Sequence, residues 1–144
     1  ARRYNPDMET YAEKLAAANG WKIVEISLRA TNVEKPNHRM FYEAGVEEFL
    51  SLVKYAECVI TNSFHGMIFA VQYCRPFYIF SREQCDTKIT ELLELFGLSG
   101  RMLTPKQQEN LTAQQIDYQA VHKRIEEARK KSLDFLRMEL SLCE

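Results

Sequence analysis

The stretch from residue 46 to residue 80 alternates a helical pattern with short apolar runs, and this alternation restricts the fold of the 144-residue chain more than any other feature. Apolar residues recur at three- and four-residue steps from Val46 to Tyr55, which predicts a helix. Two short apolar runs, Cys58 to Thr61 and Pro76 to Phe80, are typical of buried strands. The nearly continuous apolar segment between them, His65 to Cys74, predicts a buried helix. Strands that alternate with helices in this order favour a parallel sheet with right-handed crossovers.

The rest of the chain extends this pattern. Asn5 followed by Pro6 is typical of a helix start, and Gly20 can end that helix. The further predicted segments are a strand at 21–28, a surface loop at 29–43, a helix from 86 to 97, a short strand at 102–103 and a long helix at 113–142. We therefore predict a doubly wound α/β domain with flanking helices.

Composition excludes several classes of protein. The formal charge is -1, from 19 Lys and Arg against 20 Asp and Glu, so the chain lacks the basic footprint of a general nucleic-acid binder. The sequence has neither a long apolar run nor a signal-peptide pattern, so we expect a cytoplasmic location. The four cysteines form no CxxC pair and have no zinc-type spacing, so we expect buried, reduced thiols and no metal site.

The segment TNSFHG, residues 61–66, lies where a predicted strand passes into the apolar helix. In open parallel α/β sheets, ligands bind beyond the carboxyl ends of the strands. The first turn of the following helix has unpaired N–H groups and a partial positive charge, which suits a phosphate or carboxylate. The three polar side chains at 61–63 can cap the helix or bind a ligand. Gly66 allows a close approach, and His65 can exchange protons near neutral pH.

The same segment also has a purely structural interpretation. Asn62 or Ser63 can serve only as a helix cap, and His65 can serve only to satisfy a buried carbonyl group. A serine nucleophile is disfavoured, because SFHG lacks the flanking glycines of a nucleophile elbow. The segment also lacks GxGxxG and GxxxxGK[ST], so it is neither an ordinary dinucleotide fingerprint nor a P-loop. The residue pattern alone therefore leaves both interpretations of the segment open, a ligand site and a purely structural turn.

A longer block of sequence carries a family resemblance. The run FLSLVKYAECVITNSFHGMIFAVQYCRPF, followed by KITELLELFGLSGRML, resembles the polysaccharide pyruvyl transferase family over roughly residues 46–103. The resemblance implies transfer of the enolpyruvyl unit of phosphoenolpyruvate onto sugar hydroxyls, which forms a pyruvate ketal on a cell-surface polysaccharide. The expected donor is phosphoenolpyruvate, with no further cofactor, and the expected acceptor is a glycan or a lipid-linked sugar.

The resemblance also implies an architecture. Members of the family resemble GT-B glycosyltransferases, which have two Rossmann-like halves and a cleft between them. This chain is similar to the C-terminal half, so we expect residues 1–144 to form one Rossmann-like domain of a longer enzyme whose N-terminal domain is missing. The start at Ala1 in place of Met agrees with that expectation. The isolated domain is expected to have little or no activity.

Site residues follow from the resemblance by position. His65 matches the motif histidine, with the implied role of a general acid that protonates the enol carbon or assists phosphate departure. The neighbouring residues of the motif are expected to line the phosphoenolpyruvate pocket, and they are Asn62, Ser63, Phe64 and Gly66.

Basic residues from other segments are expected to complete the pocket. Some family members have Arg at the position of Ser63, where a guanidinium can form a bidentate pair with a carboxylate or phosphate. Arg82 and Lys88 follow the predicted strand at 76–80, and Arg29 follows the predicted strand at 21–28, so all three are candidates for the same edge of the sheet.

Two other functions remain open from the sequence. One is a non-catalytic module that binds a nucleotide or another anion, or that docks a neighbouring domain through its long C-terminal helix. The other is a GT-B-like glycosyltransferase domain that uses a nucleotide sugar.

Overall fold

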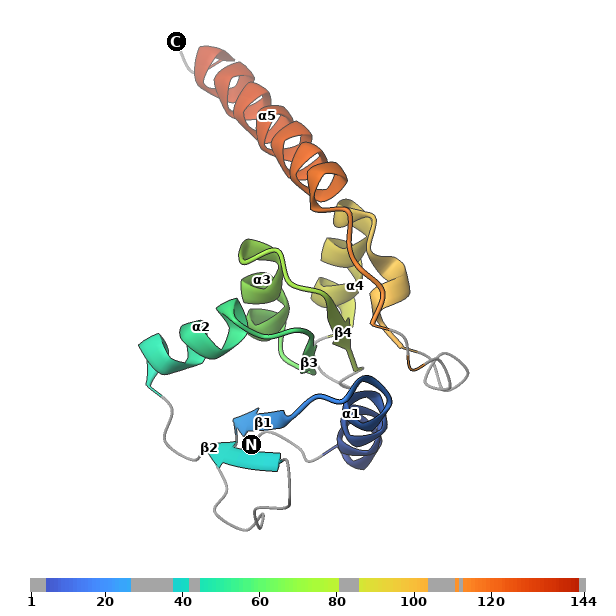
Figure 1. Ribbon diagram of the computed structural model, residues 1–144. Coiled ribbons are helices and arrows are strands. Elements are labelled where there is room, and N and C mark those ends of the chain that lie inside the picture. Colours follow the sequence, from blue (N-terminus) through green and yellow to red (C-terminus); the bar gives the residue numbers. More distant parts are fainter. Residues whose placement is uncertain are drawn as a thin grey trace.

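The computed structural model describes residues 5–26, 38–41, 45–80, 86–103, 111 and 113–142. These residues form an α/β arrangement in which helices lie beside short parallel strands, and the last helix projects away from the other elements (Figure 1). The helices are α1 (Pro6–Asn19), α2 (Val46–Lys54), α3 (Phe64–Gln72), α4 (Asp86–Phe96) and α5 (Tyr118–Leu142). The strands are β1 (Ile23–Ile26), β2 (His38–Phe41), β3 (Val59–Thr61) and β4 (Phe77–Ile79).

All described strand pairs are parallel, as predicted. In the described part of the chain they form two separate two-stranded sheets, β1 with β2 and β3 with β4. Thr61 at the end of β3 is in register with Ile79 at the end of β4, and the Phe80 N–H donates to the Thr61 carbonyl at 2.9 Å. Strands β3 and β4 therefore end at the same edge, and α3 and α4 both begin beyond that edge. The doubly wound, Rossmann-like order of a complete sheet stays a prediction.

The main hydrophobic core lies between β4 and the helices α3, α4 and α5. Phe77 and Ile79 of β4 are fully buried, as are Met67 of α3 and Ile89 of α4. Val121 extends this core to α5. A second cluster joins α1 to the opposite face of β4, where Tyr11 and Leu15 pack with Tyr78 and Phe80. Burial on both faces explains why β4 is apolar throughout, as expected of a strand in a parallel sheet.

The N-terminal helix has the ends that the sequence predicts. The Asn5 side chain accepts a hydrogen bond from the Met8 N–H at 3.2 Å, and Pro6 occupies the first helical position. Gly20 ends the helix with φ of +69°. This is the left-handed conformation that glycine adopts most readily.

Two predicted boundaries are wrong. Residues 38–41 form a parallel strand with β1, although 29–43 was expected to be a surface loop. The sequence HRMF has too few apolar residues to predict a strand, and only its pairing with β1 in the folded protein defines it as one. The last helix begins at Tyr118, five residues later than its predicted start at Ala113, because Asp117 caps it by accepting from the N–H groups of Gln119 and Ala120.

Candidate functional site

The segment from Thr61 to Gly66 connects β3 to α3 through a short turn. The Thr61 hydroxyl accepts a hydrogen bond from the Ser63 N–H at 3.0 Å, which closes the turn locally. Ser63 is the N-cap residue, with extended backbone, and its side chain makes no capping hydrogen bond to the helix. The first N–H groups of an α-helix have no partner within the helix, so this end of α3 keeps the donors and partial positive charge that suit an anion.

Gly66 packs directly against Thr61. A Cβ atom built on Gly66 would lie 2.5 Å from the Thr61 hydroxyl oxygen and 3.1 Å from the Thr61 Cβ. These distances are shorter than ordinary van der Waals contacts, so no larger residue fits without movement of the β3–α3 turn. The glycine in TNSFHG therefore allows the first turn of α3 to lie close to the end of β3.

His65 is exposed in the first turn of α3. Its ring meets the Phe64 ring edge-on, with 5.8 Å between the ring centroids and an interplanar angle of 90°. Because the ring is exposed, His65 is not a core histidine that satisfies a buried carbonyl group. The imidazole is accessible to a ligand at the start of the helix.

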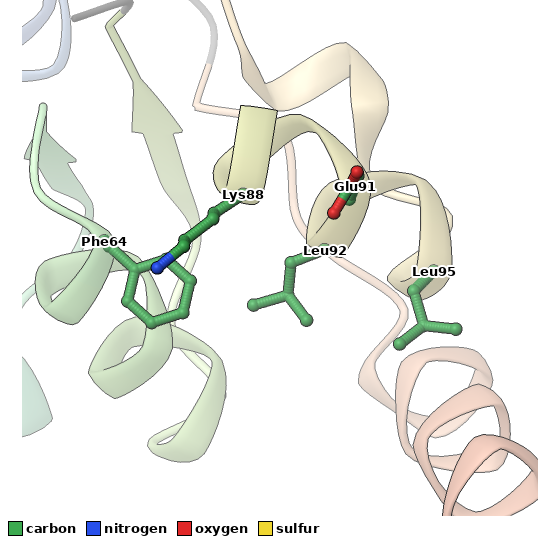
Figure 2. Close-up of a pocket in the computed structure, with 5 residues that line it drawn as sticks. All are labelled: Phe64, Lys88, Glu91, Leu92 and Leu95. Atoms are coloured by element: carbon green, nitrogen blue, oxygen red, sulfur yellow. The ribbon is translucent and has the colours of Figure 1, made fainter. Parts of the chain in front are cut away.

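Phe64, at the start of α3, and one face of α4 from Lys88 to Leu95 line a pocket of about 350 Å³. Figure 2 shows the Lys88 side chain reaching from α4 toward Phe64, while Leu92 and Leu95 form the apolar wall. Glu91 completes the lining. The structure thus brings together one motif residue and one basic residue that are 24 positions apart in the sequence, at the strand edge where both were predicted.

The structure describes some of the other predicted site residues and not others. Asn62 and Ser63 are half-buried in the turn, next to the start of α3. Arg29 and Arg82 lie outside the described residues, so their proposed positions stay predictions. The described residues contain no group of three or more His, Cys, Asp or Glu side chains arranged to hold a metal ion.

Sequence reasoning missed three pocket residues, Glu91, Leu92 and Leu95. From the sequence, these three residues had no role in the site beyond membership of the predicted helix from 86 to 97. A signal was present, because residues 88, 91, 92 and 95 follow the three- and four-residue steps of one helix face. The sequence did not show that this face meets Phe64 across a pocket.

Comparison with known proteins supplies the decisive observation. Residues 2–84 match the family described as polysaccharide pyruvyl transferase, which is more than half of the chain. The chain belongs to the polysaccharide pyruvyl transferase family. No curated protein and no solved structure matches it.

The matched region places the TNSFHG turn inside the family domain. It begins earlier than the block at residues 46–103 that carries the resemblance, and it includes α1 and both two-stranded sheets. It ends before α4, so Lys88 lies just beyond it. None of the described helices combines the length and apolar character needed to cross a membrane.

Proposed function

We propose that this chain forms the phosphoenolpyruvate-binding part of a pyruvyl transferase that builds a pyruvate ketal on a sugar acceptor. The observation that carries the proposal is the placement of SFHG, which lies within the region matched to the family, at the start of α3 beside a pocket lined by Lys88. Phosphoenolpyruvate carries a carboxylate and a phosphate, and both suit the positive end of a helix supplemented by an ammonium group.

In this proposal, each part of the site has one task. The first N–H groups of α3 bind one anionic group of phosphoenolpyruvate, and Lys88 attracts the other across the pocket. Lys88 thus takes over the charge that an arginine at the position of Ser63 supplies in some family members. Phe64 forms the apolar wall beside the enol methylene group.

His65 is the proposed general acid. Its imidazole donates a proton to the methylene carbon of phosphoenolpyruvate, which leaves the adjacent carbon electron-poor. Two hydroxyl groups of the sugar then add to that carbon and inorganic phosphate leaves. One hydroxyl proton leaves with the phosphate, the other restores the proton of His65 through solvent, and the methylene has become the methyl group of the ketal. An exposed histidine at a helix start can perform this step, because it is accessible to the donor and can regain its proton from solvent.

Replacing His65 by Ala in the complete enzyme that carries this chain tests the assignment. Loss of a general acid is expected to lower kcat by about 100-fold or more, while KM for phosphoenolpyruvate changes less, because the N–H groups and Lys88 remain. Gln72→Ala, at the exposed other end of α3, is the matched control and should keep the wild-type rate. Unchanged ketal formation by the His65→Ala enzyme would show that His65 is not the acid.

A further inference from the structure

A second pair of reactive side chains lies at the opposite end of α3. Cys74 Sγ is 3.7 Å from His122 Nε2, and both residues are exposed. This distance lies within the range of a hydrogen bond to sulfur. The nine residues of α3 separate this pair from the SFHG turn by about 13 Å of helix, so the pair is not part of the proposed phosphoenolpyruvate site.

The backbone at Cys74 is unusual. Its φ is +55°, and it is the one residue other than glycine with positive φ in the part of the chain that the structure describes. Its position after α3 is one at which glycine is common, and the Arg75 N–H donates to the Ala70 carbonyl at 2.9 Å, as in a Schellman motif. Cys74 therefore carries a side chain at a backbone conformation that favours glycine. Strained positions of this kind occur often at functional sites.

The base of α5 holds the imidazole against this thiol. The Tyr118 hydroxyl donates to the Arg75 carbonyl and lies 3.4 Å from the Ala70 carbonyl oxygen, so α5 is tied to the end of α3. His122 comes one helical turn after Tyr118, and the two rings lie 6.1 Å apart. Cys74, which was predicted to be buried, is thus presented at the surface with a base from another helix beside it.

We propose that Cys74 and His122 form a reactive thiol site that undergoes exchange with small-molecule disulfides. His122 Nε2 takes the thiol proton, and Cys74 Sγ attacks one sulfur of the disulfide. The old S–S bond breaks and a mixed disulfide forms on Cys74. The second half of the small molecule leaves as a thiolate, which accepts the proton from His122. Cys74 is oxidised and the small disulfide is reduced by the same two electrons.

The neighbouring cysteine Cys58 supplies an internal comparison. Cys58 is half-buried, and burial raises its pKa to about 11, against the opposing effect of the Arg101 guanidinium. A thiol with so high a pKa is almost wholly protonated near neutral pH and attacks disulfides slowly. Cys58 is therefore expected to stay unmodified under conditions in which Cys74 reacts.

Reaction of the full-length chain with dithionitrobenzoate tests the proposal. Cys85→Ser and Cys143→Ser leave only Cys58 and Cys74, and peptide mapping by mass spectrometry then identifies the modified residue. We expect Cys74 to react before Cys58, and roughly tenfold faster in the folded chain than Cys74 reacts in denaturant. Oxidised glutathione is expected to modify the same residue. Cys74→Ser should abolish the fast phase.

The His122→Phe variant separates an assisted thiol from one that is merely exposed. It keeps a ring beside Tyr118 but removes the base, so the Cys74 rate should fall roughly tenfold, while Lys123→Ala on the same helix should leave it unchanged. Far-UV circular dichroism confirms that α5 is intact in both variants. The proposal would be overturned if Cys74 reacted no faster in the folded chain than in denaturant. It would also be overturned if Cys74 reacted equally fast in the folded His122→Phe variant and in the chain that keeps His122.

Discussion

At the scale of single residues, the β3–α3 turn depends on the contact between Gly66 and Thr61. The Thr61 hydroxyl has two neighbours, because it accepts from the Ser63 N–H at 3.0 Å and lies where a Cβ on residue 66 would come within 2.5 Å. A change at either position therefore alters the direction in which α3 leaves the strand. That direction sets where the first turn of α3, with Phe64 and His65, lies relative to the start of α4.

Gly66→Ala is expected to destabilise the protein by about 1–3 kcal/mol, because a methyl group in tightly packed surroundings forces a shift of the turn. Urea denaturation measures this change in the free energy of unfolding. Gly100→Ala is the matched control, since a Cβ there meets nothing within 4 Å, and it should be close to neutral.

A double-mutant cycle identifies the cause. In a Thr61→Ala background the closest contact is gone, so the cost of Gly66→Ala should be smaller than in the wild type. A Gly66→Ala protein as stable as the wild type, or an equal cost in both backgrounds, would show that the turn does not need the glycine.

At the scale of secondary-structure elements, α5 is held mainly at its base. Val121 is buried in the main core, and Tyr118 bonds to carbonyl oxygens at the end of α3, whereas residues further along, such as Leu133 and Met138, are exposed. Burial strongly raises the pKa of the Tyr118 phenol, so the hydroxyl stays protonated and donates its single hydrogen mainly to the Arg75 carbonyl, with the Ala70 carbonyl oxygen nearby. The first turns of α5 therefore determine how the helix is attached to the domain.

Tyr118→Phe is expected to cost about 1–2 kcal/mol, because it removes the hydrogen-bond donor to partly buried carbonyl groups at the end of α3. Hydrogen exchange should become faster in the first turns of α5, while α1 stays unchanged. Gln119→Ala, at an exposed position in the same turn, is the control. Unaltered exchange at the base of α5 in Tyr118→Phe would contradict this account of the attachment.

Sequence patterns predicted those elements whose apolar residues report burial directly. The stripe of α2 and the apolar runs of β3, α3 and β4 indicated both type and place within two residues, and capping residues indicated the ends of α1. Strand β2 was missed because its HRMF sequence carries no such pattern, and only its pairing with β1 identifies it as a strand. The sequence therefore predicts an element well where a periodic apolar pattern marks its buried face, and poorly where only pairing with another strand defines it.

The candidate site was predictable to a similar extent. The position of SFHG at the junction of a strand and a helix was predicted, and the anion site there stays a prediction. The parallel order of β3 and β4 accounts for the position of Lys88 near the same edge. Glu91 and Leu95 were not found, because the pocket that they line is formed by two helices whose relative placement depends on packing in the core. The contact between Cys74 and His122 was hidden for the same reason.

At the scale of the whole molecule, polar groups buried between α1 and the β3–β4 sheet couple stability to pH. Burial raises the pKa of Tyr11 to about 12, with a further contribution from nearby Tyr78, and burial raises the pKa of Cys58 to about 11. In the unfolded chain these groups lose their protons near pH 10 and pH 9. The unfolded state therefore binds fewer protons than the folded state at high pH. The contribution of these two groups to the free energy of unfolding is fully present below pH 9 and is lost as the pH rises toward 11 and 12.

Thermal unfolding followed from pH 7 to pH 11 checks this dependence. The wild type should lose stability above about pH 9, and Tyr11→Phe should show a shallower loss, by on the order of 1 kcal/mol over that range. Tyr55→Phe, which removes a phenol from a residue that is 72 % exposed, should keep the wild-type slope. Equal slopes for Tyr11→Phe and the wild type would rule out Tyr11 as a source of the loss.

The proposal for the whole molecule is that the SFHG turn, which lies within the region matched to the family, and Lys88 together bind phosphoenolpyruvate. Titration of the isotope-labelled chain with phosphoenolpyruvate, followed by NMR, tests it most directly. The backbone amide signals of residues 62–67 should shift in a saturable way, and Lys88→Met should weaken the affinity about threefold or more, whereas Lys54→Met at the exposed end of α2 should not. The absence of any shift in residues 62–67 at millimolar phosphoenolpyruvate would contradict the proposal.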